Sequence, residues 1–167
     1  QKERLLDIIR HYVIFEYSEG NLIKKLPRYQ QIRATDKTIP KLKKHNKGGV
    51  IWHTQGSGKS ITMAYIARKL QADENGFNNP TILIMTDRVD LDTQITTTFN
   101  NIVGFKNIHH ANSVVHLEKL LRNDYGGIIT TTIQKFQEQD KTTEVTSDIT
   151  SQSEDETIRI EKEVKDG

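Results

Sequence analysis

The middle of the chain alternates between apolar blocks of strand length and segments whose apolar residues recur at helical spacing. A near-continuous apolar run at residues 81–86 predicts a strand buried on both faces, and residues 128–132 predict a further strand. A shorter strand is predicted at residues 107–110, and Val50 and Ile51 are expected to begin another buried strand. Helical spacing predicts helices between these strands, at about residues 60–71, 91–99 and 114–121.

This alternation predicts an α/β fold. Strand–helix–strand units build a parallel sheet, and right-handed crossovers place helices on both of its faces. Ligands of such sheets bind at the carboxyl ends of the strands. The chemistry of this chain is therefore expected at that edge of the sheet.

The segments that precede the alternation are less regular. Residues 3–17 predict an amphipathic helix, because their apolar residues fall on one face. Glycine, asparagine and proline interrupt residues 18–27, and residues 28–34 predict a second, short helix. Residues 35–47 are polar and basic and contain Pro40, so they are expected to form a loop.

Charge divides the chain into two unequal parts. Residues 137–167 hold ten acidic and four basic residues, whereas residues 1–136 hold twelve acidic and twenty basic residues. The acidic part has almost no large apolar residues and predicts a solvated arm or loop. The basic part favours a polyanion as partner, with an ordinary basic surface as an equal alternative.

Length and composition set further bounds. The 167 residues are enough for about one domain. Because the chain begins at Gln1 and ends in a charged run, it is expected to be a piece of a larger protein. It has no cysteine, which excludes disulfides and thiolate metal sites and fits the reducing cytoplasm. No apolar run approaches the roughly 20 residues of a membrane span, so no membrane partner is predicted.

The strongest chemical signal is the sequence TQGSGKS, which lies between a predicted strand and a predicted helix, as in a phosphate-binding P-loop. Its glycines let backbone N–H groups converge on phosphate oxygens, and the helix that follows presents its positive end to them. Lys59 is the expected catalytic residue, reaching the β- and γ-phosphates, and the Ser60 hydroxyl is the expected Mg²⁺ ligand. The predicted nucleotide-binding residues here are Thr54, Gln55, Gly56, Ser57, Gly58, Lys59 and Ser60.

Where the full P-loop consensus has its first glycine, this chain has His53. The departure weakens the match to kinases and small GTPases and leaves the match to helicase-like motors intact. Upstream, the sequence RYQQIRA resembles the R-x-x-Q-x-x-A element of superfamily 2 helicases. On that alignment Gln31 reads the adenine edge, because an amide offers both a donor and an acceptor. A plain polar helix face is the alternative.

Two more motifs narrow the class. The sequence TDRVDLDTQ at residues 86–94 resembles motif Ia of type I restriction R subunits, in which Arg88 would contact the DNA backbone while Asp87 and Asp90 cap the helix and orient Arg88. The sequence TTIQKF at residues 131–136 resembles motif Ic of the same family. The DNA contacts predicted from it are Thr131, Gln134 and Lys135.

Taken in order, these motifs resemble the first RecA-like motor domain of the R subunit of a type I restriction enzyme, a P-loop NTPase domain that is incomplete here. The resemblance implies ATP and Mg²⁺ as cofactors, and double-stranded DNA and the methylation and specificity subunits as partners. It implies a parent enzyme, an ATP-dependent site-specific deoxyribonuclease, that translocates DNA before cleaving it. The predicted division is an N-terminal helix and linker at 1–27, the motor domain at 28–136 and an acidic tail at 137–167.

The family's motif II, written D-E-A-H, does not occur in the sequence. The chain alone is therefore expected to lack ATP hydrolysis. Three alternatives stay open: a type III restriction subunit or another superfamily 2 translocase, a nucleotide-binding switch that never hydrolyses, and a small-molecule kinase. The last of these explains neither TDRVDLDTQ nor TTIQKF.

Overall fold

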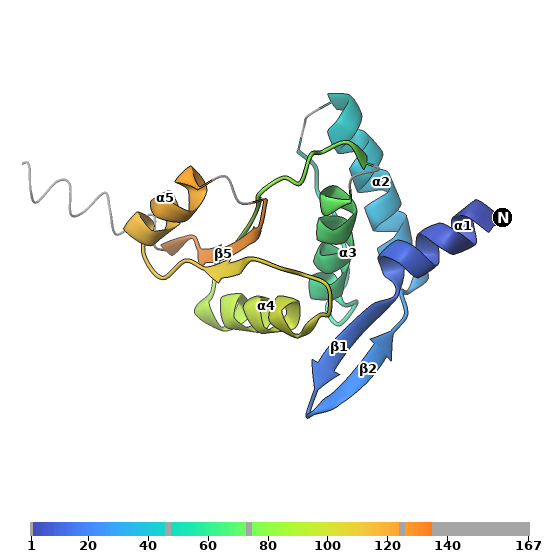
Figure 1. Cartoon of the computed structure of the whole chain (residues 1–167), viewed down its shortest axis with the longest axis horizontal. Coiled ribbons are helices and arrows are strands. Elements are labelled where there is room, and N and C mark those ends of the chain that lie inside the picture. Colours follow the sequence, from blue (N-terminus) through green and yellow to red (C-terminus); the bar gives the residue numbers. More distant parts are fainter. Residues whose placement is uncertain (1, 46–47, 73–74, 124–125, 135–167) are drawn as a thin grey trace, which may run out of the picture.

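The computed structural model describes residues 2–45, 48–72, 75–123 and 126–134. Figure 1 shows the order of the elements along the chain. They are α1 (Lys2–Asp7), the π-helical turn η1 (Ile8–Tyr12), β1 (Ile14–Ser18), β2 (Asn21–Lys25), α2 (Tyr29–His45), α3 (Lys59–Gln71), β3 (Ile82–Thr86), α4 (Val89–Asn101), β4 (Ile108–His110), α5 (Val114–Arg122) and β5 (Ile128–Thr132).

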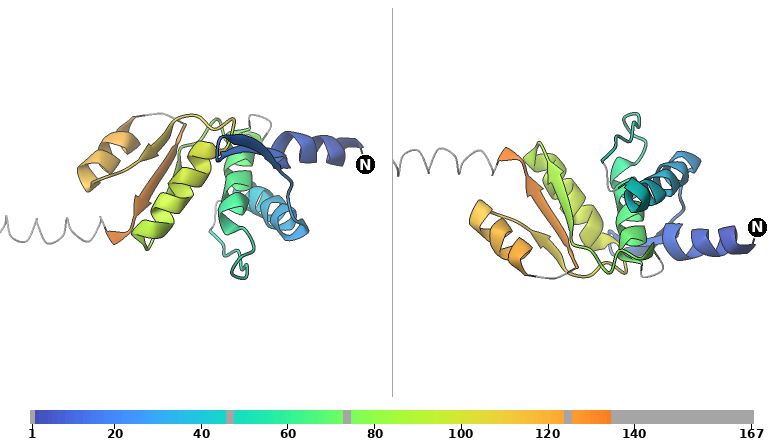
Figure 2. Two further views of the ribbon diagram at one scale, coloured as in Figure 1. Left: turned by 90° about the horizontal axis from the view of Figure 1, so that it is seen from below. Right: turned by 90° about the horizontal axis from the view of Figure 1, so that it is seen from above.

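A three-stranded parallel sheet in the order β3-β5-β4 forms the centre of the α/β part. Its two faces are covered by α4 and α5 (Figure 2). Ile128 of β5 packs with Ile95 and Phe99 of α4, while the next residue, Ile129, packs with Leu117 of α5. Alternate side chains of a strand point to opposite faces, so β5 is buried on both. The predicted α/β fold, with a parallel sheet between helices, is confirmed.

The strand β3 lies at an edge of this sheet, with β5 on one side only. Its Leu83 and Met85 side chains are 39% and 45% exposed, so the prediction that this strand is buried on both faces is wrong. The strand expected at Val50 and Ile51 is also not formed, and Val50 is 90% exposed. An apolar run predicts burial only where neighbouring elements cover both of its faces.

Helix α2 is much longer than the sequence pattern predicts. It continues through residues 35–45, where a loop was expected, with Pro40 inside it. An interior proline removes one backbone hydrogen bond and costs about 3 kcal/mol. Burial opposes that cost, because Thr35 and Ile39 are almost fully buried on the helix face that packs against α3. The predicted loop at residues 35–47 is therefore wrong for residues 35–45, because packing against α3 stabilises a helix there.

The N-terminal segment contains a β-hairpin where one continuous helix was predicted. The helix ends at Tyr12, and β1 pairs with β2 across a turn in which Glu19 and Gly20 both have positive φ. Such φ values suit a two-residue turn between twisted strands. Tyr12 and Ile14 are fully buried in the same core as α3 and α4. The structure therefore corrects the prediction of one helix over residues 3–17, and the division of the chain at residue 27 stays a prediction.

A partly buried ionic cluster joins the N-terminal helix to α2 and α3. Lys69 of α3 contacts Asp7 at 2.8 Å and Asp36 of α2 at 3.3 Å. Asp36 also accepts hydrogen bonds from Arg4 and from the Tyr12 hydroxyl. Partial burial raises the pKa of the Asp36 carboxyl, but its hydrogen bonds with Arg4 and Tyr12 and the charge of Lys69 outweigh that effect, so the pKa lies below the ordinary 3.8.

We predict that Asp36→Asn lowers the free energy of unfolding by about 2 kcal/mol at pH 7, because it leaves buried donors without a charged acceptor. A carboxyl whose folded pKa is depressed contributes stability above its ordinary pKa and loses it as the pH falls through the folded value. The difference between wild type and variant should therefore shrink as the pH falls from about 5 toward 2. Urea unfolding followed by circular dichroism at several pH values measures it.

Glu118→Gln on α5 is the matched control, because Glu118 is an exposed carboxylate outside the cluster. It should change stability by less than about 0.5 kcal/mol at every pH. Equal effects of the two substitutions at pH 7 would contradict a stabilising role for the ionic cluster.

Candidate nucleotide-binding site

The predicted P-loop forms a tight turn immediately before α3. Gly56 and Gly58 have φ of 74° and 79°, in the left-handed region that favours glycine, and Ser57 N–H donates to the Thr54 carbonyl at 3.3 Å. The Ser57 hydroxyl is buried and has no hydrogen-bond partner among the described atoms. Helix α3 begins at Lys59, so its free N–H groups and positive end lie at this turn. The turn therefore has the geometry of an anion cradle.

The side chain of Lys59 folds back over the loop. Its ammonium donates to the carbonyls of His53 at 3.1 Å and Thr54 at 2.9 Å. An ammonium has three donors, so one remains for a phosphate oxygen. Ser60, in the first turn of α3, is half-buried, and Gln55 is exposed beside Gly56. The structure thus brings the predicted residues 54–60 together at one helix end.

Gln31 of α2 fastens this loop in place. Its Nε2 donates to the carbonyls of Ser57 and Gly58, both at 3.2 Å, and its Oε1 accepts from Arg28 N–H at 2.8 Å. The side chain is only 4% exposed. Both amide donors are therefore committed to the P-loop, while Oε1 retains one acceptor site. Sequence reasoning identified this residue but not its contact with the loop.

A shallow cavity of about 260 Å³ opens beside Gln31. Arg28 and Leu26 flank it from the chain entering α2, and Leu26 is 64% exposed. The residues lining the cavity are Lys25, Leu26, Arg28, Gln31, Gly56, Ser57, Gly58 and Ile61. An apolar side chain and an amide acceptor next to a phosphate cradle are features that suit a purine base.

The residues predicted to contact DNA lie at the carboxyl ends of β3 and β5. The Gln134 amide donates to the Asp87 carbonyl at 3.1 Å, which joins the two motifs after these strands. Arg88 is exposed, with Nε 3.8 Å from the Asp87 carboxylate. The expected capping of α4 by Asp87 and Asp90 is wrong, because the N-cap position is Arg88 and makes no side-chain cap hydrogen bond.

Thr131 is placed differently from the other predicted contacts. Its side chain is fully buried in β5, and its hydroxyl has no hydrogen-bond partner among the described atoms. Of the predicted DNA contacts that the structure describes, Arg88 and Gln134 are therefore exposed and Thr131 is not. Lys135 lies outside the described residues.

The family model of the SWI2/SNF2 ATPases matches residues 30–162. The match covers most of the chain, including the P-loop and both motifs at the sheet edge. The chain belongs to the SWI2/SNF2 ATPase family. Membership implies ATP as the nucleotide of the P-loop, and it confirms the fold class that the strand–helix alternation predicts.

Relatives of this SWI2/SNF2 ATPase chain are endonuclease subunits of type I restriction enzymes. The HindI endonuclease subunit of Haemophilus influenzae is 45% identical over 148 residues, which cover 81% of this chain and 14% of the relative. A candidate MjaIXP endonuclease subunit of Methanocaldococcus jannaschii is 32% identical over 142 residues, covering 81% and 13%. The predicted resemblance to R subunits is confirmed. The chain spans about one-seventh of the length of these relatives.

The SWI2/SNF2 ATPase chain also contains a buried polar contact that sequence reasoning missed. Asp92, within TDRVDLDTQ, is 1% exposed, and its Oδ2 lies 3.2 Å from Nδ1 of His110 at the end of β4. Thr96 and His110 both contact the Thr130 hydroxyl of β5. These contacts hold α4 against the strand ends, so Asp92 has a structural role in the motif.

Within the described residues, no helix is long and apolar enough to span a bilayer.

We predict that Gly58→Ala disturbs the loop more than Gly56→Ala. Both positions require a left-handed backbone, which costs an alanine about 1 kcal/mol. A Cβ at Gly58 would also lie 2.6 Å from Gln31 Nε2, whereas a Cβ at Gly56 meets nothing within 4 Å. Gly58→Ala should therefore lower the free energy of unfolding by about 1–2 kcal/mol more than Gly56→Ala, because it displaces the Gln31 amide from the two carbonyls that it binds.

A double-mutant cycle tests that explanation. In a Gln31→Ala background the two glycine substitutions should have nearly equal effects on urea unfolding. If the excess cost of Gly58→Ala persists there, contact with Gln31 is not its cause.

Proposed function

We propose that this chain is the ATP-binding part of the motor of a type I restriction R subunit, a cytoplasmic enzyme that uses ATP hydrolysis to translocate double-stranded DNA before cutting it. The observation that carries the proposal is the P-loop fastened by Gln31, with Lys59 over the loop and a base-sized cavity beside it. Similarity to endonuclease subunits of type I restriction enzymes supports the rest. In such a complex the methylation and specificity subunits would be partners.

In this proposal Gln31 reads adenine through its oxygen alone. Because Nε2 is held by Ser57 and Gly58, the remaining acceptor site of Oε1 faces the base. Adenine presents an N6 amino donor, which this oxygen can accept, whereas guanine presents the O6 acceptor at the same position. Two facing acceptors repel, so the arrangement favours ATP over GTP.

The phosphates would lie in the cradle that precedes α3. The positive end of α3, the free donor of Lys59 and the unpartnered hydroxyl of Ser57 fit a polyphosphate. Ser60 is the proposed protein ligand of Mg²⁺, together with phosphate oxygens. The described residues contain no cluster of three or more His, Asp or Glu suited to a metal ion. Ser60 would therefore hold Mg²⁺ only in company with the nucleotide.

The DNA backbone would lie at the sheet edge where Arg88 and Gln134 meet. Arg88 supplies the charge, and the Gln134 side chain ties its motif to the loop that carries Arg88. Lys135, next in the sequence, adds a second cation in this proposal. A type III restriction subunit would share these features, and the sequence of its motif II would distinguish it.

We predict that the 167-residue chain binds fluorescent ATP with Mg²⁺ and does not hydrolyse it. Lys59→Ala should weaken binding at least about tenfold, since it removes a charge-assisted contact to phosphate. Gln31→Ala should narrow the preference for ATP over GTP, measured by competition. The control is Lys24→Ala, which changes an exposed lysine of β2. It should leave both the affinity for ATP and the preference for ATP over GTP unchanged. Failure of a folded wild type to bind ATP, or an unchanged base preference in Gln31→Ala, would refute the proposed site.

We also predict that Arg88→Ala weakens binding of a duplex oligonucleotide severalfold. It should also reduce the slope of the logarithm of the binding constant against the logarithm of the salt concentration by about 0.9, the value for one phosphate contact. Fluorescence anisotropy at several salt concentrations measures both quantities. Arg122→Ala on α5 removes the same charge elsewhere and serves as control. Equal losses in the two variants would mean that the edge has no special affinity for DNA.

A further inference from the structure

His110 is the last residue of β4, which pairs with β5 on the side opposite β3. The three strands run parallel, so their carboxyl ends meet at one edge of the sheet. That edge also carries Arg88 after β3 and Gln134 after β5. Neighbouring strands lie about 4.8 Å apart, so β3 and β4 are separated by about 10 Å across the sheet. His110 therefore lies at the same edge as the proposed DNA contacts, which do not include it.

One ring nitrogen of His110 faces the interior. Its Nδ1 lies 3.2 Å from Oδ2 of Asp92 on α4 and 3.3 Å from the Thr130 hydroxyl of β5. A bare lone pair on Nδ1 would face the carboxylate and be repelled by it, so Nδ1 carries a proton. The Thr130 oxygen accepts that proton and also contacts the Thr96 hydroxyl at 2.7 Å. These neighbours fix both the tautomer and the direction of the ring.

The other ring nitrogen, Nε2, faces solvent. The His110 side chain is 35% exposed. Its Nε2 has no hydrogen-bond partner among the described residues and is not one of their buried unpartnered atoms. In the neutral ring Nε2 can only accept a hydrogen bond, whereas in the cationic ring it donates one. A phosphate oxygen at Nε2 therefore needs the cationic ring.

The surroundings of Asp92 favour an ion pair at this position. Asp92 is 1% exposed, and its Oδ1 has no hydrogen-bond partner among the described atoms. A buried carboxylate without hydrogen bonds is costly, and a cation beside it offsets part of that cost. His110 is its one ion-pair partner in the described part of the chain, and no other described carboxylate pairs with His110. A phosphate at Nε2 and the carboxylate at Nδ1 would therefore stabilise the same cation from two sides.

We propose that His110 is a further contact for the phosphates of duplex DNA, with Asp92 as the residue that positions and charges its ring. The inference rests on the proposed function, because it needs a DNA backbone at this edge of the sheet. Phosphates of one strand follow at about 3.4 Å along the helix axis, so Arg88 and His110 contact different phosphates. Binding takes up a proton at Nε2, so by linkage the affinity rises as the pH falls. Arg88 cannot produce this dependence, because a guanidinium stays charged.

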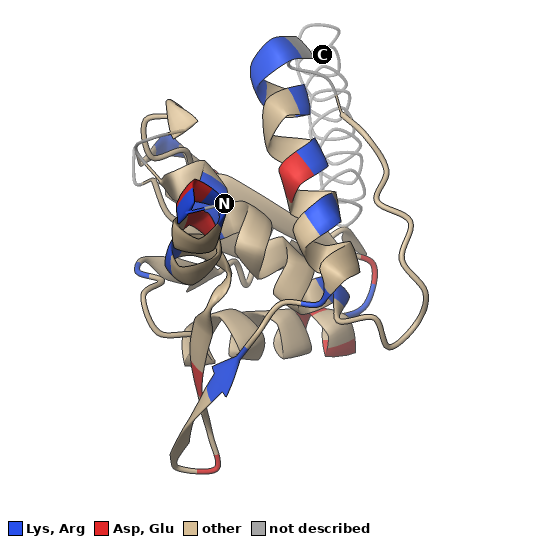
Figure 3. Ribbon diagram, turned by 90° about the vertical axis from the view of Figure 1, so that its right-hand side faces the viewer, with Lys and Arg blue, Asp and Glu red and all other residues tan. Residues whose placement is uncertain are grey.

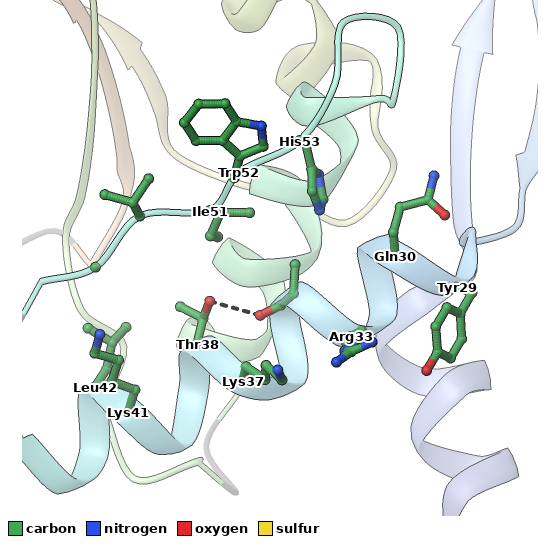
Figure 4. A pocket seen from close by; sticks show the side chains of 13 residues that line it. Tyr29, Gln30, Arg33, Lys37, Thr38, Lys41, Leu42, Ile51, Trp52 and His53 are labelled. Carbon is green, nitrogen blue, oxygen red and sulfur yellow. Dashed lines mark hydrogen bonds between the residues drawn. The ribbon is translucent and has the colours of Figure 1, made fainter.

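The basic surface of α2 is a separate set of charges. Figure 3 shows basic positions recurring along this helix, and Figure 4 shows Lys37 and Lys41 beside a groove of about 580 Å³. Lysine side chains keep their charge between about pH 6 and 8. A duplex held by such a surface alone would bind with the same affinity across that range. The pH profile therefore distinguishes a contact at His110 from general attraction to a basic surface.

Fluorescence anisotropy with a duplex oligonucleotide at fixed ionic strength, between about pH 6 and 8, tests the proposal. The affinity of the wild-type chain should rise severalfold as the pH falls. Calorimetry in buffers of different ionisation enthalpy should show proton uptake on binding. His110→Gln should remove the pH dependence and, at about pH 6, reduce the slope against salt concentration by about 0.9, one phosphate contact. Asp92→Asn should weaken the pH dependence, because it removes the charge that faces Nδ1, whereas Arg88→Ala should lower the affinity and keep that dependence.

The matched controls are His116→Gln on α5 and Lys41→Ala on α2, which should both keep the pH dependence. Circular dichroism at each pH verifies that the variants are folded. Should His110→Gln not fold, proton uptake by the wild type and by His116→Gln decides in its place.

A wild type that binds duplex through Arg88 with no pH dependence and no proton uptake would overturn the role of His110 alone. An undiminished pH dependence in a folded His110→Gln would do the same. If the wild type binds no duplex at any pH, or if Arg88→Ala loses no more affinity than Arg122→Ala, the proposed DNA edge fails, and the contact at His110 fails with it.

Discussion

The side-chain amide of Gln31 fixes the position of the P-loop relative to α2. A loop with two left-handed glycines has many conformations in isolation, and two hydrogen bonds from one buried amide select the conformation found here. Gly58 makes the contact possible, because any Cβ there would meet the amide. The cavity proposed for the nucleotide has Gln31 and the loop among its walls, so its shape depends on this contact.

The position of α2 depends in turn on packing that is not visible in its own sequence. Pro40 and the surrounding lysines favour a loop, but the buried Ile39 and the Asp36–Lys69 contact hold the segment as a helix against α3. Local propensity costs a few kcal/mol at most, and contacts between distant residues outweigh it. The same reasoning explains the hairpin, since Ile14 alternates into a core made by α3 and α4.

The parts of the fold that could be predicted are those in which pattern and packing agree. The strand at Ile128–Thr132 consists of β-branched residues, which favour strands, and it lies between two helices, so its local propensity and its packing agree. Val50 was predicted to lie in a buried strand, but it is exposed, because no described strand pairs with it. At the site, the spacing of Gly56, Gly58 and Lys59 predicted the turn before α3, since a P-loop is a local structure, while the binding roles of these residues stay predictions. The burial of Thr131 was not predictable, because it depends on which strands flank β5.

Some of the basic side chains of the chain make contacts inside the fold and others are exposed, a difference that the net charge alone does not reveal. Arg68 donates to the Val13 carbonyl at 2.7 Å, and burial lowers the pKa of its guanidinium. Together with Lys69 it stabilises the core, whereas Arg33 and Arg88 are exposed, and Arg88 Nε lies 3.8 Å from the Asp87 carboxylate. A cation paired inside the fold contributes nothing to steering a polyanion, while an unpaired one at the surface does. In the proposed function, affinity for DNA would therefore depend on exposed side chains such as Arg88, and its salt dependence would count those that contact phosphates.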